Sequence, residues 1–513
     1  MNLSSAHQLR RLIPRWRRFA TISRLPETGS VGAKQQLDPN NDPFFQSQLA
    51  SWNEDQSIEN AIDLVAYGIV SGFHVQVADA AGFLLDKGEE VTPAQRQLAE
   101  EILDHVRGHK DPGKVRDTLP VPAFNLVEVA VFVRKDIAKI KRQLIEWPRN
   151  AVLWVELSRL YSIVGQQQKS SRAMQVALGL AQGNRFVVRS AARLAVHHRQ
   201  PERALRVIHA VHGFQNDPWL LASEIAITCI LGRTSRNTKR AVDILKRERY
   251  SPEHITELAG AVGTLELTKG TAKIARAFFK QSLVRPNDNA LAQAEWAAPR
   301  IGDIDTTVPA DVLNPHEALA RHSLGEADWL LAMNHTFRWA EDEPFSSAPS
   351  AIGSYVAAAL LEDFQTSLDF CDLGLQSNPE DLDVKNNKVV ALAQLGRLDE
   401  AISLYQSIGR VESDSDNAAV ITATGGLLAF RSGDISAGRR LYQAASELAS
   451  KRKNGRIKAM AAIYLAREEL QAGTEEVQHS LVRAEHDFKG QEKDKEVQRI
   501  MENLRAAAEN APK

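Results

Sequence analysis

The residues best suited to bind a charged partner are arginines near the start of the chain. Five of them lie within one short stretch that no acidic residue precedes: Arg10, Arg11, Arg15, Arg17 and Arg18. Guanidinium groups bind phosphate and carboxylate oxygens, so this stretch could contact an anionic partner such as nucleic acid. The same composition also fits an organellar targeting segment, although Pro14 would interrupt its helix, or an inert tail. All three interpretations stay open.

Other reactive residues do not form a recognisable catalytic set. The sequence has no glycine-lysine phosphate loop, no Gly-x-Ser-x-Gly, no His-Glu-x-x-His and no Cys-x-x-Cys. His105 and His109 have the spacing of one helix face, but no further metal ligand lies beside them. We therefore expect no catalytic residue, no metal ion, no cofactor and no small-molecule substrate.

Composition narrows the class of protein. The 513 residues carry a net charge of −1, so no overall field attracts nucleic acid or a membrane surface. The two cysteines, Cys229 and Cys371, are too few for a disulfide framework and indicate a reducing compartment. The sequence lacks both a run of about 18 apolar residues and the apolar core of a secretory signal. We expect no membrane contact and a cytoplasmic location.

A regular spacing of small residues indicates the elements that position these side chains. Two sets occur, with steps of 34, 37 and 34 residues and then of 34 and 37 residues: Ser170, Ala204, Ala241 and Ala275, followed by Ser367, Ala401 and Gly438. A large residue follows each of them four places later, as Met174 and Phe279 do. A period of 34 residues is typical of a stack of helix pairs in which the small residue marks the closest crossing.

The clearest repeat resembles the tetratricopeptide superfamily, of bacterial type and without a more specific family. Its matching residues are Trp154, Leu157, Tyr161, Gly165, Ser170, Met174 and Ala177. The resemblance implies an all-α fold: a right-handed α-solenoid of antiparallel helix pairs with a concave, partner-binding face. Residues 150–296 are also similar to tetratricopeptide regions of large bacterial proteins that carry a PIN-like nuclease module, but residues 1–145 show no pattern for that module.

Breaks in the repeat spacing divide the chain into six regions. They are a disordered basic segment (1–50), a helical region (51–147), a first array (148–300), a divergent helical insert or linker (301–350), a second array (351–490) and a charged C-terminal helix or tail (491–513). The Pro and Gly residues of region 1–50 predict disorder there. The polar composition of region 491–513 predicts a charged helix or tail.

The resemblance places the first helix of each pair on the concave face. Carried onto the first two repeats, it puts Arg159, Arg189, Arg193 and His197 there. Such arginines could bind carboxylate or phosphate in a bidentate manner. Alternatively, they pair with Glu156 and other nearby acids, or face solvent.

Tryptophans could stack on single-stranded nucleic acid, as aromatic side chains do in basic grooves. The candidates are Trp219, Trp296, Trp329 and Trp339. Their neighbours in the sequence are rich in Ala and Leu and poor in basic residues, which favours packing in the core.

We therefore expect a non-enzymatic scaffold that holds a peptide or helix of a partner protein in the solenoid groove. The alternative is an accessory subunit that contacts nucleic-acid phosphates through the N-terminal arginines and the groove arginines.

Overall fold

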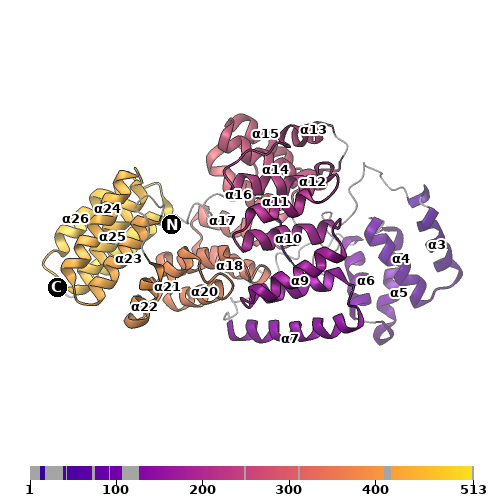
Figure 1. Ribbon diagram of the computed structural model, residues 1–513, viewed down its shortest axis with the longest axis horizontal. Coiled ribbons are helices and arrows are strands. Elements are labelled where there is room, and N and C mark those ends of the chain that lie inside the picture. Colours follow the sequence, from indigo (N-terminus) through magenta and orange to yellow (C-terminus); the bar gives the residue numbers. More distant parts are fainter. Residues whose placement is uncertain are drawn as a thin grey trace.

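The computed structural model describes residues 12–17, 39–41, 43–71, 75–91, 93–106, 126–247, 250–309, 312–409 and 417–510. Every regular element in these ranges is a helix, and most consecutive helices lie side by side as antiparallel neighbours (Figure 1). This confirms the all-α solenoid predicted from the repeat spacing. No helix in the described ranges has the length and apolar character needed to cross a lipid bilayer.

The N-terminal helices pack on one another before the first array begins. They are α3 (Pro43–Glu54), α4 (Ile58–Ser71), α5 (Ala78–Asp86) and α6 (Pro93–Val106). Phe45, Trp52 and Leu64 lie in their shared apolar core. The longer helix α7 (Leu126–Glu146) packs its buried Leu144 against the beginning of the first array.

The first array consists of four helix pairs. They are α8 (Ala151–Ile163) with α9 (Gln167–Leu180), α10 (Arg185–His197) with α11 (Pro201–His209), α12 (Pro218–Ile230) with α13 (Thr238–Lys246), and α14 (Pro252–Lys269) with α15 (Ala272–Ser282). The side chains of Asn150, Asn184 and Asp217 accept hydrogen bonds from backbone N–H groups at the starts of α8, α10 and α12. These caps satisfy donors that have no partner within the helix, so local sequence fixes where these three pairs begin.

The periodic small residues lie where paired helices cross. Ser170, Ala204, Ala241, Ala275, Ser367 and Ala401 are fully buried. At Gly438, an added Cβ would lie 2.3 Å from the ring of Phe430, so even an alanine would collide there. This close approach is the physical reason for the repeated spacing.

Three helices connect the two arrays. They are α16 (Asp288–Ile301), α17 (His316–Glu326) and α18 (Trp329–Asp342). Helices α17 and α18 pack on each other, and α17 also packs on α16. The region predicted as an insert or linker therefore adds one more helix pair to the stack.

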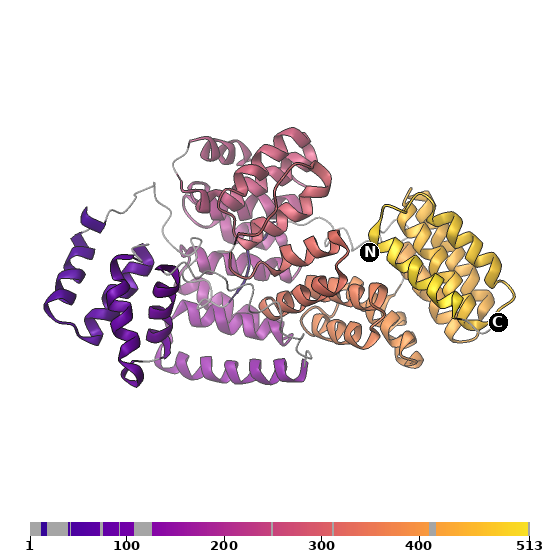
Figure 2. The same cartoon turned by 180° about the vertical axis from the view of Figure 1, so that it is seen from behind.

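The second array continues the same arrangement. It comprises α19 (Ser347–Tyr355), which leads into a π-helical turn (Val356–Leu360), α20 (Phe364–Ser377), α21 (Leu382–Gln394), α22 (Leu398–Ile408), α23 (Ala418–Arg431), α24 (Ile435–Lys451), α25 (Gly455–Ala472) and α26 (Val477–Phe488). In both views, α23–α26 lie at the opposite end of the molecule from α3–α6 (Figure 1 and Figure 2).

The final helix, α27 (Lys495–Glu509), packs on α25. Its sequence is charged, but four apolar side chains on one face are buried in the core of the second array: Val497, Ile500, Met501 and Leu504. The helix therefore covers the end of the solenoid with an apolar face, and Glu496 at its start pairs with Arg456 of α25 and accepts a hydrogen bond from the hydroxyl of Tyr355.

The start of the first array contacts the start of the second array. Gly165, in the turn between α8 and α9, has a φ of +70°, and an added Cβ would lie 2.5 Å from the carbonyl oxygen of Gln376 at the end of α20. Arg199 donates a hydrogen bond of 2.7 Å to the carbonyl of Glu380. The solenoid thus turns far enough for repeats distant in sequence to meet.

Candidate functional site

An extended peptide lies on the inner helices of the first array. This segment, Leu12–Arg17, which we call the N-terminal segment, has neither helical nor strand structure. Leu12 is 1% exposed and Trp16 is fully buried. We call the surface that holds it the inner groove, formed by α10, α12, α14, α16, α17 and α18. Of the residues predicted as a disordered tail, 12–17 lie on the inner helices and 43–50 belong to α3.

Leu12 anchors one end of the segment. Its side chain packs with Leu221 of α12 and Leu258 of α14. Its Cδ1 lies 2.7 Å from the position that a Cβ on Gly260 would occupy. A side chain on Gly260 would therefore displace the end of the Leu12 side chain.

Trp16 anchors the other end. Its ring meets the ring of Phe345 edge to face, with centroids 5.2 Å apart. The same core cluster contains Leu160, Val187 and Leu194 from α8 and α10. The indole N–H of Trp16 is buried and has no hydrogen-bond partner among the described residues. The socket therefore binds the ring by shape and apolar contact.

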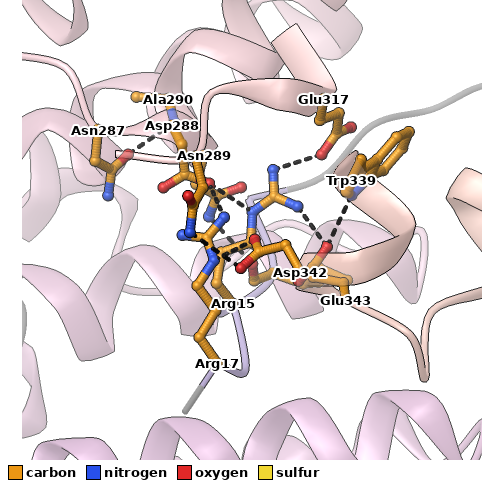
Figure 3. A network of polar contacts seen from close by, with 12 residues as sticks. Arg15, Arg17, Asn287, Asp288, Asn289, Ala290, Glu317, Trp339, Asp342 and Glu343 are labelled. Carbon is orange, nitrogen blue, oxygen red and sulfur yellow. Dashed lines mark hydrogen bonds and ion pairs between the residues drawn. The ribbon is translucent and has the colours of Figure 1, made fainter. Parts of the chain in front are cut away.

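Arg15 enters a group of three carboxylates between these anchors. Its guanidinium lies 2.5 Å from Glu317, 2.6 Å from Glu343 and 3.2 Å from Asp288 (Figure 3). Burial disfavours the charged guanidinium, but these carboxylates outweigh burial and raise the pKa of Arg15. The arginine is therefore held as a cation within a mostly enclosed site.

Arg17 binds a second pair of carboxylates. It lies 2.5 Å from Asp342 and 2.8 Å from Asp288, so Asp288 is shared between the two arginines (Figure 3). Burial acts to raise the pKa of Asp288, but Arg17 and Arg15 outweigh burial and lower it. At Asp342, burial dominates and raises the pKa despite Arg17.

The carboxylates are themselves held by other side chains. Glu317 accepts two hydrogen bonds from Arg321, and Glu343 accepts one of 3.1 Å from the indole N–H of Trp339. The amide of Asn289 donates a hydrogen bond of 3.2 Å to the backbone carbonyl of Ile13. The inner groove thus contacts both the side chains and the backbone of the N-terminal segment.

The predicted groove arginines are buried in the inner face. Arg159 pairs with Glu156 at 3.2 Å, and Arg189 pairs with Glu257 at 2.9 Å. These contacts match the alternative in which the arginines pair with nearby acids. Their role in binding a partner stays a prediction.

Two further predicted residues converge on Phe345. The guanidinium of Arg193 lies 4.9 Å from the ring centroid, and burial lowers its pKa. The ring of His197 lies 5.8 Å from the same centroid, and burial, with smaller effects of Arg193 and His198, lowers its pKa to about 3. Both residues therefore help to build the socket that holds Trp16.

The structure describes only two of the five N-terminal arginines. Arg15 and Arg17 bind the carboxylates of the inner groove, whereas Arg10, Arg11 and Arg18 lie outside the described residues. Arg15 and Arg17 thus contact anionic groups within the chain, on carboxylates more than 270 positions away.

Three of the candidate stacking tryptophans are buried in the core: Trp219, Trp296 and Trp339. Each lies under an arginine: Arg189, Arg300 and Arg321, at 5.1, 4.5 and 5.9 Å from the ring centroids. The packing interpretation therefore holds for them. Arg300 follows Trp296 by four residues in the same helix, whereas folding brings Arg189 to Trp219 and Arg321 to Trp339.

Sequence reasoning missed the acidic side of the groove. Its four carboxylates are Asp288, Glu317, Asp342 and Glu343. The only sequence signal is the short acidic run 341–343 beside a tryptophan helix. Across the described ranges, no group of three or more His, Cys, Asp or Glu side chains is placed to hold a metal ion.

Comparison with known proteins gives distant structural similarity. No protein-family model matches the chain. No curated protein sequence matches it either. A solved structure of a human IFIT1 dimer with PPP-AAAA has a TM-score of 0.35 and 11% identity, and covers 73% of this chain and 94% of that one. A monomeric IFIT1 mutant with Gppp-AAAA has a TM-score of 0.34 and 10% identity, and covers 72% and 95%. Similarity at this level carries no argument about ligands.

Proposed function

We propose that this chain is a non-enzymatic scaffold of the tetratricopeptide type, and that its inner groove holds an extended peptide of a partner protein. The observation that supports the proposal is the N-terminal segment, which occupies the groove as a peptide ligand would. The repeat motif around Trp154 and Gly165 supports the assignment to this superfamily. The low cysteine count fits a cytoplasmic site of action.

The groove selects for a particular kind of peptide. It provides an apolar contact for an aliphatic residue, a deep socket for an aromatic ring, and carboxylates for two arginines on either side of that ring. Buried aromatic and arginine side chains carry most of the binding energy in protein interfaces. The expected partner sequence therefore places a tryptophan or phenylalanine between two basic residues.

The chain's own segment competes with such a partner. A tethered ligand has an effective concentration in the millimolar range when its linker is short and flexible. The indole N–H of Trp16 is buried without a hydrogen bond, which reduces the binding free energy of the segment by about 1–3 kcal/mol. A partner whose aromatic residue lacks a buried donor has this advantage over the N-terminal segment.

A peptide-binding measurement tests the proposal. The full chain is prepared as wild type and with Arg15→Glu and Arg17→Glu, which repel the groove carboxylates and release the N-terminal segment. A fluorescent peptide of residues 10–18 is then titrated by anisotropy. We expect the double variant to bind it at least about tenfold more tightly than the wild type, because its groove is open.

Two controls make the result specific. A peptide with both central arginines changed to glutamate should not bind, and adding Glu317→Gln to the double variant should weaken binding. If the double variant keeps its helical circular dichroism and does not bind the peptide, the proposal is wrong.

Nucleic-acid association is the second candidate function. The basic stretch of residues 10–18 is the observation that favours it, since arginine side chains can contact phosphates. This function predicts RNA or DNA binding that weakens steeply with added salt. Within the described residues, Arg15, Arg17, Arg159 and Arg189 already have carboxylate partners, so the groove geometry favours the peptide.

A further inference from the structure

The exposed face of α7 is strongly basic, although the chain as a whole is nearly neutral. Between positions 134 and 149 the sequence has six basic residues and only two acidic ones. The buried face of the helix is apolar, and Val133, Ile140 and Leu144 pack there against the first array. The basic residues lie on the remaining faces and in the turn that follows, and all are exposed: Arg134, Lys135, Lys139, Lys141, Arg142 and Arg149.

Most of these cations have no acidic partner. Within the described residues, four of them take part in no hydrogen bond, ion pair or ring contact: Arg134, Lys139, Arg142 and Arg149. The buried arginines of the N-terminal segment differ, because carboxylates of the inner groove neutralise them. Unneutralised charges of one sign on one surface attract a partner of the opposite sign.

Helix α9 widens this basic surface. The ammonium groups of Lys141 on α7 and Lys169 on α9 both approach the ring of Tyr161, at 5.9 and 5.7 Å from its centroid. Arg172 follows Lys169 by one turn of α9 and is exposed. Helices α7 and α9 both pack on α8, so they join their basic residues into one surface, which we call the α7–α9 surface. In Figure 1, α7 lies along the lower edge of the molecule.

An exposed tryptophan lies at the end of the α7–α9 surface. Trp147 directly follows α7 and is 64% exposed, and no other tryptophan of the described residues is as exposed. The turn that carries it is held in place, because the indole N–H of Trp154 donates a hydrogen bond of 2.8 Å to the carbonyl of Pro148. Arg142 and Arg149 lie on either side of Trp147 in the sequence. An aromatic ring among basic residues suits the stacking of a nucleobase.

We propose that the α7–α9 surface binds a single-stranded nucleic acid. Its arginines and lysines contact successive phosphates, and one base stacks on the ring of Trp147. From Arg134 to its end, α7 rises about 18 Å, which is long enough for a site of about four nucleotides. The proposal gives the second candidate function a surface of its own, apart from the N-terminal arginines, and it does not depend on what the inner groove binds.

Two other anionic partners fit this surface less well. A duplex offers phosphates but keeps its bases stacked, so Trp147 would have no base to contact. A lipid membrane takes up the apolar row of an amphipathic helix. The apolar row of α7 is buried in the protein, and among its described side chains only Ile145 and the adjoining Trp147 are exposed large apolar groups.

Titration of the full-length protein with labelled oligonucleotides tests the proposal. Oligo(U) and oligo(dT) of about 12 nucleotides are followed by anisotropy. Either strand supports the proposal, because phosphates and bases make the contacts. We expect affinity to fall steeply between about 50 and 200 mM salt. Lys139→Gln with Arg142→Gln should weaken binding about tenfold and reduce the salt slope by about 1.4, since two phosphate contacts are lost.

Two further positions separate stacking from charge. Trp147→Ala should weaken binding about tenfold at an unchanged salt slope, whereas Trp147→Phe keeps a ring and should retain most of the affinity. Glu146→Gln removes an exposed acid from the same surface and should strengthen binding at least about twofold. A gain in affinity cannot come from damage to the fold.

Two control variants locate the binding. Arg236→Gln with Lys239→Gln removes two exposed charges at the start of α13 and should leave affinity unchanged. Replacing Arg10, Arg11 and Arg18 together by glutamine should also leave it unchanged. Loss of binding in this triple variant, with binding kept in the α7 variants, would overturn the proposal and leave nucleic-acid association to the N-terminal arginines.

Three other outcomes would also overturn the proposal. In the first, the chain binds neither oligonucleotide. In the second, a duplex of equal length binds as tightly as the single strands, and Trp147→Ala weakens neither. In the third, the chain sediments with vesicles of phosphatidylserine and phosphatidylcholine and does not bind the oligonucleotides, which would assign the surface to a membrane.

Discussion

At the scale of single residues, the same side-chain type has two different roles in this molecule. Arg15 and Arg17 belong to an extended segment and bind carboxylates from α16, α17 and the end of α18. Arg189 and Arg193 belong to an inner helix and stack on Trp219 and Phe345. A buried guanidinium needs a carboxylate or an aromatic face to offset its lost hydration, and the chain supplies both.

His197 should make stability depend on pH. Its folded pKa of about 3 is below the value of about 6.5 expected in the unfolded chain. Between these values the unfolded chain binds a proton that the folded chain does not, so stability decreases as pH falls through this window. We expect His197→Gln to reduce this decrease by up to about 1.4 kcal/mol per pH unit.

Thermal unfolding at pH 7 and pH 5 measures this effect. The loss of unfolding temperature between the two should be smaller for His197→Gln than for the wild type. The exposed His486, changed to Gln, serves as the control. An equal loss in all three proteins would show that His197 is protonated in the folded state.

At the scale of elements, helix pairs are fixed locally, whereas contacts between arrays depend on single turns. Gly165 and Gly232 have the same φ of +70° at the turns inside two helix pairs. An added Cβ at Gly165 would meet the carbonyl of Gln376, but at Gly232 it would meet nothing within 4 Å. Comparing substitutions at these two glycines therefore separates the energetic cost of backbone strain from that of losing the contact between the arrays.

Substituting alanine at these two glycines tests that contact. Gly232→Ala should cost about 1–2 kcal/mol from the left-handed backbone alone. Gly165→Ala should cost more and should increase amide hydrogen exchange at the end of α20, because the turn and α20 must separate. Equal losses of unfolding temperature would contradict the importance of this contact.

At the scale of the whole molecule, the stability of the solenoid depends on helices that cover its ends and on side chains that fill its inner groove. Helix α27 buries apolar side chains against α25, and the N-terminal segment fills the inner groove. A repeat stack that loses its end helix exposes the apolar face of the next one.

Truncation after residue 490 should therefore cause self-association. We expect a larger mass in light scattering than for the full chain, and a lower unfolding temperature. Truncation after residue 510, which leaves α27 intact, is the matched control. An unchanged mass and stability after the first truncation would show that α27 does not protect the end of the array.

Sequence by itself determined the helix pairs, because they depend on residues close together in the chain. Small residues such as Ala204 and Ala275 mark the helix crossings, and caps such as Asn184 mark the helix starts. The helix pairs follow from local periodicity and capping, which the chain carries within each repeat. The resemblance to the tetratricopeptide superfamily implied the inner position of Arg189 and Arg193.

Tertiary structure alone decided what fills the groove. Arg15 pairs with Glu343, 328 positions away. The residues that bury Trp16 come from other helices, so the composition around Trp16 gives no sign of its burial and predicts disorder. Charge pairing and burial depend on which distant side chains meet, and only the superhelical turn of the solenoid brings them together.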